Sequence, residues 1–267
     1  MSQPRPVSSA RPLALVTGGS SGIGRELARQ FTLHGFDLVI GGSSDRVEEA
    51  AAALRRNNAT VVPVKSDLAT YDGVEAVWKA VQDTGRPLAA TALNAGIGIG
   101  GAFIDTALED ELRMIAINAT SQVHLAKRIV PAMVAVRSGR ILFTSSLSAT
   151  TPTPYETVYG PTRAFVYSFA ESLREELLGT GVTVTALLPG ATDSEFHQRA
   201  GMGDTKFGDN SWKNSRELVA RKGFEAMMAG RDHVIGGDRA TWRAAVRNKF
   251  LPERVKAHRQ AKMARPD

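Results

Sequence analysis

The chain has 267 residues, 43% of them hydrophobic, which suffices to bury a sizeable core in an α/β domain. It contains no cysteine, so disulfides, thiolate metal sites and cysteine nucleophiles are excluded; we predict no metal site and a reducing, cytoplasmic location. No apolar run is long enough to span a membrane, and residues 1–11 lack the apolar segment of a signal peptide, so a disordered tail is expected there.

The formal net charge of +6 is unevenly distributed along the chain. Residues 241–267 contain eight Lys or Arg side chains against two acids, Glu253 and Asp267, and this segment therefore accounts for the whole excess. The rest of the chain is balanced, which argues against a nucleic-acid partner.

The N-terminal segment has the order of elements that a dinucleotide fingerprint requires. An apolar run at residues 13–16 predicts a buried strand, and the glycine-rich turn 17–24 follows it directly. Apolar residues spaced from Ile23 to Phe31 then predict a helix that ends at Gly35. Such glycines let backbone N–H groups approach a pyrophosphate at the positive end of a helix, although an ordinary turn is the alternative.

The alternation of strands and helices continues along the chain. Further strands are predicted at residues 36–40, 60–64, 88–93, 140–145 and 183–188, with a strand-like segment at 232–235. Helices are predicted at residues 45–57, 71–83, 108–136 with a local break at Pro131, 159–178, 215–229, and from 239 onward. Six strands alternating with helices predict an α/β fold, a doubly wound parallel sheet with helices on both faces.

Polar residues or glycines directly follow five of the predicted strands. They are Gly18, Asp67, Asn94, Ser146 and Gly190. Because ligands of such sheets bind beyond the carboxyl ends of the strands, we expect these residues to form one site. Asp67 has an alternative role, since Ser-Asp before a helix is also typical of an N-cap.

Taken together, these residues resemble the short-chain dehydrogenase/reductase family over residues 12–196. The motifs that carry the resemblance are Thr17-Gly18-x-x-x-Gly22-Ile23-Gly24, Asp67, Asn94-Ala95-Gly96, Asn118, Ser146, Tyr159 and Pro189-Gly190. The resemblance implies a Rossmann-type fold and hydride transfer between a nicotinamide cofactor and a ketone or secondary alcohol. It divides the chain into the tail 1–11, a dinucleotide-binding and catalytic domain 12–238, and a basic helical extension 239–267.

The resemblance also assigns the catalytic roles. Tyr159 would be the general acid/base, Ser146 would donate a hydrogen bond to the substrate oxygen, and Asn118 would hold a relay water at a small kink in its helix. Arg163 stands where the family has a lysine, four residues after the tyrosine. An arginine supplies a permanent charge and can donate to ribose oxygens, but its planar fork is bulkier than an ammonium and it cannot pass on a proton. We therefore expect cofactor binding with slower or narrower turnover, and the alternative is a dinucleotide-binding sensor or scaffold with impaired catalysis.

A nicotinamide dinucleotide is the expected cofactor, and NADP(H) is favoured over NAD(H). The residues expected to bind it are Gly18, Ser20, Ser21, Gly22, Ile23, Gly24, Ser43, Ser44, Arg46, Asp67, Leu68, Asn94, Ala95, Gly96, Tyr159, Arg163, Pro189, Gly190 and Thr192. The second strand ends without the carboxylate that NAD enzymes use for the ribose 2′-hydroxyl, since Asp45 comes later as a helix-start residue. Two serines and Arg46 could instead receive a 2′-phosphate.

Residues 191–214 lack periodicity and are predicted to be the loop that selects the substrate, a small carbonyl or alcohol. Family members commonly form homo-dimers or homo-tetramers through the helices after the fourth and fifth strands, so an oligomer is expected, and no integral membrane association is. In the extension, Trp242, Val246 and Phe250 recur at helical spacing between basic residues. Such a stripe could lie on an anionic membrane, although we favour packing against the domain or a partner subunit.

Overall fold

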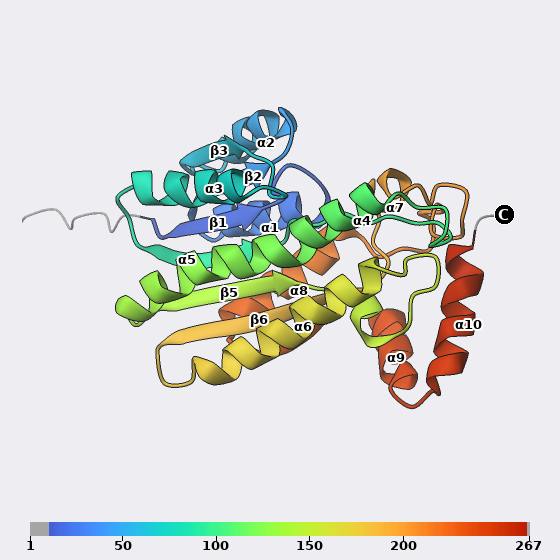
Figure 1. Cartoon of the computed structure of the whole chain (residues 1–267). Coiled ribbons are helices and arrows are strands. Elements are labelled where there is room, and N and C mark those ends of the chain that lie inside the picture. Colours follow the sequence, from blue (N-terminus) through green and yellow to red (C-terminus); the bar gives the residue numbers. More distant parts are fainter. Residues whose placement is uncertain (1–10, 266–267) are drawn as a thin grey trace, which may run out of the picture.

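A parallel sheet of seven strands, in the order β3-β2-β1-β4-β5-β6-β7, runs through the centre of the protein (Figure 1). The structure is a computed structural model and describes residues 11–265, so the tail expected at residues 1–11 lies, apart from Arg11, outside the described residues. The strands are β1 (Leu13–Thr17), β2 (Asp37–Gly42), β3 (Val61–Lys65), β4 (Leu88–Leu93), β5 (Gly139–Thr144), β6 (Val182–Pro189) and β7 (His233–Gly236). The predicted doubly wound parallel sheet is confirmed, and the strand-like segment 232–235 supplies its seventh strand.

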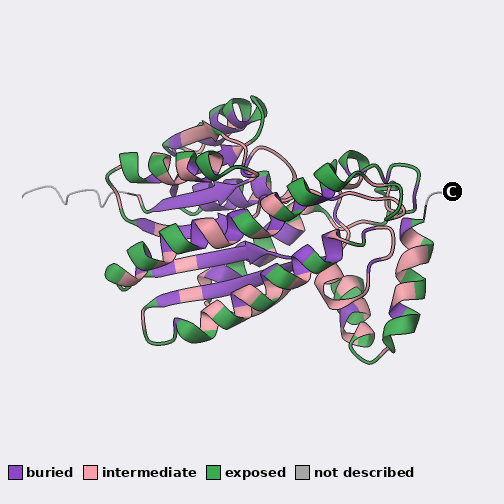
Figure 2. Cartoon of the chain, viewed as in Figure 1, coloured by how far each residue is buried: buried purple, intermediate pink, exposed green. Residues whose placement is uncertain are grey.

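Helices cover both faces of the sheet, because successive strand residues point to opposite sides. Leu13 and Leu15 of β1 belong to one core, and Ala14 and Val16 belong to the other. The first core is closed by α3 (Tyr71–Asp83), α5 (Ser121–Ala135) and α6 (Tyr159–Glu176). The second is closed by α1 (Gly22–Leu33), α2 (Arg46–Arg55) and α8 (Arg216–Met228). In Figure 2 the central strands are correspondingly mostly purple, the colour of buried residues.

The long helical region after β4 is divided at a different place from the one predicted. It consists of α4 (Leu108–Ile115), a π-helical turn η1 (Ala116–Thr120) and α5. The break expected at Pro131 is wrong, because α5 continues through this proline, which lies on the exposed side of the helix. The carbonyl groups that proline leaves without an N–H partner therefore face solvent.

The strand order predicts a crevice next to the central strands β1 and β4. The chain proceeds outward from β1 to β2 and β3, then returns to the other side of β1 with β4. Neighbouring crossover connections leave β1 and β4 on opposite faces of the sheet, which opens a crevice beyond their carboxyl ends. This is the topological position at which a ligand is expected.

The basic extension forms two helices at the same end of the sheet as α4 and the short helix α7 (Phe196–Arg199), as Figure 1 shows. The last helical region is α9 (Arg239–Asn248) and α10 (Glu253–Ala264), separated at Pro252. The aromatic stripe does not pack fully against the domain, since Trp242 is 54% exposed and Phe250 is 82% exposed. The other expected packing, against a partner subunit, stays a prediction. No helix among residues 11–265 is long and apolar enough to cross a bilayer.

Candidate active site

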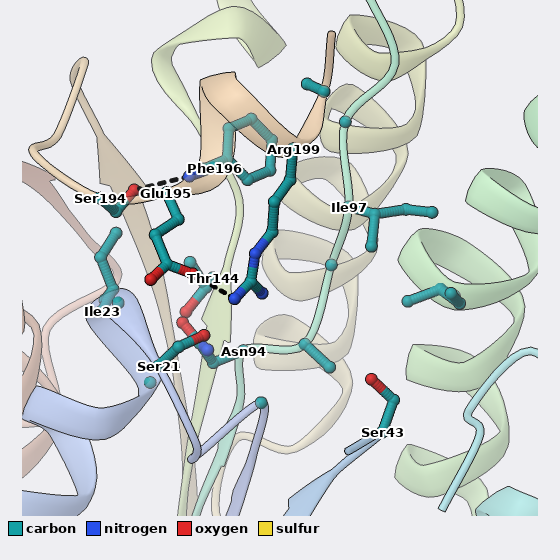
Figure 3. A pocket seen from close by; sticks show the side chains of 18 of the residues that line it. Ser21, Ile23, Ser43, Asn94, Ile97, Thr144, Ser194, Glu195, Phe196 and Arg199 are labelled. Atoms are coloured by element: carbon teal, nitrogen blue, oxygen red, sulfur yellow. Dashed lines mark hydrogen bonds and ion pairs between the residues drawn. The ribbon is translucent and has the colours of Figure 1, made fainter. Parts of the chain in front are cut away.

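A cleft of about 1190 Å³ lies beyond the carboxyl ends of the strands. Six strands contribute the residue at or just after their end, namely Gly18, Gly42, Asp67, Asn94, Thr144 and Gly190. Figure 3 shows side chains from these segments directed into the same space. Of the five residues expected to converge, four line the cleft, whereas Ser146 does not and its neighbour Ser145 does.

The glycine turn lines one side of the cleft with backbone groups. Gly18 has a φ of +66° and Gly22 a φ of +53°, conformations that favour glycine. A Cβ on Gly24 would lie 2.1 Å from the carbonyl oxygen of Gly18, so only glycine lets α1 begin this close to the turn. The N-terminus of α1 consequently faces the cleft with its unpaired N–H groups, an arrangement suited to phosphate.

The Asn94-Ala95-Gly96 segment is fixed to the glycine turn by a single side chain. The Thr17 hydroxyl accepts hydrogen bonds from the backbone N–H of Asn94 at 2.9 Å and of Ala95 at 3.1 Å. The Asn94 side chain donates to the Thr17 carbonyl at 3.2 Å. These bonds hold the ends of β1 and β4 together at the floor of the cleft.

Arg163 and Tyr159 lie together on α6, one turn apart. The Arg163 Cζ is 5.1 Å from the centroid of the Tyr159 ring, a cation–π geometry. Arg163 is buried, its Nη1 donates to the Thr144 carbonyl at 3.2 Å, and its guanidinium packs directly against Gly96. The guanidinium thus occupies the space between α6 and the floor of the cleft, and it also lines the cleft.

Asn118 lies in the π-helical turn, where the family resemblance places a kink. Its Oδ1 accepts from the N–H of Ile97 at 2.9 Å, and its Nδ2 donates to the Ile97 carbonyl at 2.9 Å and to the Thr162 hydroxyl at 3.1 Å. This completely buried amide therefore connects the segment after β4 to α6. Both of its amide protons are used, which leaves one Oδ1 lone pair for a further donor.

Ser145 and Ser146 have different local roles. The Ser145 hydroxyl donates to the Arg163 carbonyl at 2.8 Å, which ties the end of β5 to α6. The Ser146 hydroxyl accepts from the N–H of Ser148 at 3.1 Å and caps the short 3₁₀ helix η2 (Leu147–Thr150). Within residues 11–265 the hydroxyl groups of Ser146 and Tyr159 do not hydrogen-bond each other. The Ser146 proton remains available for another acceptor.

The loop 191–214 covers the tyrosine. The ring centroids of Phe196 and Tyr159 are 5.3 Å apart, and Tyr159 is only 8% exposed and does not line the cleft. Phe196 also packs so closely on Gly98 that a Cβ there would lie 2.6 Å from its ring. The Gly100 N–H donates to the Ala200 carbonyl at 2.8 Å, which fastens the loop to the segment after β4.

Beyond Phe196 the loop is held by a stack of aromatic rings. The imidazole of His197 lies parallel to the ring of Phe207, with centroids 5.1 Å apart, and Phe207 in turn contacts Trp212. Lys213 Nζ donates to His197 Nδ1 at 3.3 Å. Burial and then the charge of Lys213 lower the pKa of His197 to about 4, so this histidine is neutral at physiological pH.

The opposite end of the cleft contains the residues considered for a 2′-phosphate. Ser43 and Arg46 line it, but Ser44 does not. Asp45 begins α2 as expected and is ion-paired with Lys65 at 2.8 Å outside the cleft. Arg46 Nη1 lies 2.8 Å from Glu195 Oε2, although 149 residues separate them in the chain.

Glu195 also binds Arg199 of α7, so that one carboxylate is shared by two arginines across the cleft. Figure 3 shows Glu195 and Arg199 directed toward one another in this space. The Arg46 hydrogen bond and the Arg199 charge hold the pKa of Glu195 below its ordinary value. This Arg46–Glu195–Arg199 bridge joins the segment after β2 to the segment after β6.

Asp67 is bound by an arginine that the sequence did not single out. Arg113 of α4 donates to both carboxylate oxygens of Asp67 at 2.9 Å, and this hydrogen bonding lowers the pKa of Asp67. The alternative N-cap role is wrong, because Thr70 caps α3 by accepting from the N–H of Gly73, while Asp67 accepts from the N–H of Ala69. The pair stands at the side of the cleft nearest β3.

The sequence profile described as short chain dehydrogenase matches residues 12–204 of this chain. The chain belongs to the short chain dehydrogenase family. Serine 3-dehydrogenase of Agrobacterium fabrum is 30% identical over 208 residues, 77% of this chain and 82% of that protein. A short-chain dehydrogenase from Sphingobium yanoikuyae in complex with NADPH has a TM-score of 0.80 at 28% identity, covering 89% of this chain and 93% of that one. L-Sorbose reductase from Gluconobacter frateurii, complexed with NADPH and L-sorbose, has a TM-score of 0.74 at 26% identity, covering 85% and 96%.

Several charged residues that line the cleft of this short chain dehydrogenase were not identified from its sequence, among them the ion-paired Arg113, Glu195 and Arg199. Arg113 pairs with a residue 46 positions away, and Glu195 pairs with one 149 positions away. No local sequence pattern predicts ion pairs between residues this far apart in the chain. Only the i, i+4 spacing of Glu195 and Arg199 was visible, and it is common on any helix.

Proposed function

We propose that this short chain dehydrogenase is an NADP(H)-dependent oxidoreductase that interconverts a ketone and a secondary alcohol, with Tyr159 as general acid/base. The observation that supports the proposal most is one cleft that brings the glycine turn and Asn94-Ala95-Gly96 together with Arg163 beside Tyr159. The relatives known to bind NADPH, from Sphingobium and Gluconobacter, share this fold over more than four fifths of the chain.

The residues present fit a dinucleotide. The crowded start of α1 provides a backbone cradle for a pyrophosphate, and three polar atoms along the cleft are buried without a partner among the described residues. They are Ser66 Oγ, Thr144 Oγ1 and Arg163 Nε. The α1 turn would hold the pyrophosphate, Arg163 would donate to the ribose beside the nicotinamide, and Asp67 would lie at the adenine end. When bound, the nicotinamide supplies or accepts the hydride.

The protein's own contribution is the control of one proton. In reduction, the Tyr159 hydroxyl gives its proton to the ketone oxygen, and in oxidation it takes one back. Ser146 donates to the same oxygen, for which its hydroxyl hydrogen is available. The fixed charge of Arg163 stabilises negative charge on the phenol oxygen, and the free lone pair of Asn118 orders a water that reprotonates it.

Arg46 supports the preference for NADP(H). Arg46 lies at the start of α2 and lines the cleft together with Ser43. This is the end of the cleft, next to the end of β2, where the adenosine ribose of the cofactor would be bound. Asp45 is the first carboxylate after β2 and would be the candidate for an NAD-binding acid, but it is ion-paired with Lys65 instead. A 2′-phosphate could replace the Glu195 carboxylate on Arg46 with a stronger, doubly charged partner.

An exposed apolar face on α4 and α6 supports the expected homo-oligomer. Leu108, Leu112 and Ile115 recur on one side of α4, and Phe165 is exposed on α6, the helices that follow β4 and β5. Burying such a face is favourable by about 25 cal/mol per Å². We therefore propose a dimer through this face, which the mass of the particle in solution and its loss on Leu112→Glu would test.

The decisive experiment screens ketones and secondary alcohols with NADPH and NADH, on the wild type and on Tyr159→Phe. Turnover with NADPH that falls by about 10²-fold or more in Tyr159→Phe, with cofactor affinity unchanged, is expected. NADH binding at least as tightly as NADPH would overturn the cofactor preference. Binding of NADPH without turnover of any compound would support the sensor instead.

A further inference from the structure

The two C-terminal helices form a projecting hairpin of unusual charge. This basic hairpin, residues 239–265, contains nine Lys or Arg side chains and one acid, Glu253. Glu253 is paired with Lys256 at 2.6 Å. Within residues 11–265 none of the other eight cations has an ion pair or a side-chain hydrogen bond, and all eight are exposed. Figure 2 shows the hairpin mostly in the colours of exposed and intermediate residues.

One side of the basic hairpin is fastened to the domain. Thr241 of α9 packs against Gly190 and Gly237, and its hydroxyl is hydrogen-bonded to Asn214 at 3.0 Å. On α10, Gln260 donates to the buried carboxylate of Glu156 at 3.2 Å. These contacts fix which side of each helix faces inward.

The opposite side presents aromatic residues among the cations. Trp242 is 54% exposed and Phe250 is 82% exposed, and Val255 follows on α10. Trp242 and Phe250 lie eight residues apart along α9 and its following turn, with Arg243 and Arg247 between them, so that they share a face. Thr241 anchors α9 and Ala245 is buried, and both lie about 60–100° around the helix from Trp242. Trp242 therefore lies on the flank of α9, where it is about half exposed, and Phe250 is the more exposed end of this aromatic face.

The charge decides what covers this face. A second copy of the chain would bring an equally basic hairpin against it, and like charges in contact repel. A nucleic-acid duplex would satisfy the arginines, but its bases are stacked inside the duplex and would leave Phe250 without an apolar partner. An anionic bilayer offers both components: headgroup charge for the basic residues, and an interface in which Trp and Phe are stabilised.

We infer that the basic hairpin is a peripheral membrane-binding surface, which docks on bilayers containing anionic lipids with Trp242 and Phe250 at the headgroup level. Neither helix is long and apolar enough to span the bilayer, so the hairpin lies on its surface. Binding depends on vesicle composition and not on turnover, and its test is therefore independent of the proposed oxidoreductase activity.

The test is sedimentation of the full chain with phosphatidylcholine vesicles, with and without phosphatidylserine. Binding is expected only with the anionic lipid, and it should weaken as salt rises from about 0.1 M to 1 M, where the Debye length shrinks from about 10 Å to 3 Å. Each basic residue near the surface is worth roughly fivefold in binding, so Arg243→Glu with Arg247→Glu should weaken it on the order of 10²-fold or more. The control is Arg56→Glu with Arg231→Glu, which makes the same change of charge at two exposed arginines outside the hairpin. This control variant should bind anionic vesicles far more tightly than the variant with both changes in α9.

The aromatic part is tested separately. Trp242→Ser with Phe250→Ser should weaken vesicle binding, whereas Leu178→Ser, at another exposed apolar residue, should not. A blue shift of tryptophan emission on binding should disappear in Trp242→Phe. Failure to bind anionic vesicles, equal losses in the control variants, or tighter binding of a DNA duplex than of vesicles would overturn the inference.

Discussion

The guanidinium of Arg163 lies over the ring of Tyr159, 5.1 Å from the ring centroid, and is held there from three sides. The Thr144 carbonyl accepts from Nη1 at 3.2 Å, Gly96 provides a flat wall without a side chain, and α6 itself carries the arginine. The cation that we expect to take the place of the family lysine is therefore set in position by the floor of the cleft. Changes in that floor should act on the chemistry.

Gly96→Ala should disable the enzyme through Arg163. A Cβ at this position would lie 1.9 Å from Arg163 Nη2, so the guanidinium would have to move from the place where its Nη1 donates to the Thr144 carbonyl. We expect kcat to fall by about 10²-fold or more, and stability to fall by about 1–3 kcal/mol from overpacking. Gly203→Ala is the matched control, because a Cβ there meets nothing within 4 Å. Equal kcat in the two variants would contradict the role given to Arg163.

Arg163→Lys should raise kcat/KM. A lysine supplies the same charge from a compact ammonium that can rotate between ribose and phenol and can exchange protons. Since positioned proton transfer contributes about 10²–10⁴-fold, we expect a gain on the order of tenfold, and a loss of at least that size for Arg163→Met, which removes the charge. Steady-state kinetics on one identified substrate decide the matter. An unchanged kcat/KM in Arg163→Lys would mean that the arginine is no handicap.

Glu195→Gln should increase the affinity for NADPH. The ion pair of Arg46 with Glu195 is exposed and therefore weak, so freeing Arg46 for a 2′-phosphate should strengthen NADPH binding by up to roughly fivefold. Arg46→Gln should weaken NADPH binding by about 10–100-fold and leave NADH unaffected, because charge-assisted hydrogen bonds are worth about 1.5–3 kcal/mol. Titration by cofactor fluorescence measures both. Asp83→Asn, which breaks the remote pair with Lys79, should change neither affinity.

Phe196→Ala should widen the range of substrates. The ring stands between Gly98 and Tyr159 and leaves the tyrosine 8% exposed, so a substrate oxygen reaches the phenol only past Phe196. We expect kcat/KM for a ketone with two bulky groups to rise relative to that for a small ketone, by about 10-fold or more. Phe103→Ala, at an exposed phenylalanine, is the control. If the ratio of the two kcat/KM values is unaltered, Phe196 does not limit the site.

The strands and the cleft could be predicted from the sequence because their signals are local. The apolar runs gave all seven strands, and the residues after them marked the cleft because parallel strands end at one edge of the sheet. The break predicted at Pro131 was wrong because the cost of a proline within a helix depends on whether it lies on the exposed side of that helix. The sequence alone does not show which side that is. Asn118 marked the actual break only through the family resemblance.

Contacts between distant segments could not be predicted. Arg113 with Asp67 and Arg46 with Glu195 are set by how α4 and the loop after β6 return over the cleft, and no periodicity encodes those paths. The closure of Phe196 over Tyr159 is of the same kind. The spacing of the aromatic residues in and after α9 could be predicted from the sequence. Their exposure could not, because it depends on the contact of Thr241 with the domain.

Glu156 should make the stability of the protein depend on pH. Burial raises the pKa of its carboxyl to about 7 from the ordinary 4.5, and the hydrogen bond from Gln260 of α10 offsets only part of this. Between these two values the folded protein keeps a proton that the unfolded chain has lost, so the free energy of unfolding falls as pH rises through this window and stays reduced above it. Glu156→Gln should therefore be more stable than the wild type by roughly 2–4 kcal/mol near pH 8 and equal to it near pH 4.5. Urea unfolding at both pH values measures the difference, and the exposed Glu176→Gln should show none. A Glu156→Gln variant whose advantage is the same at both pH values would show that packing, and not ionisation, is responsible.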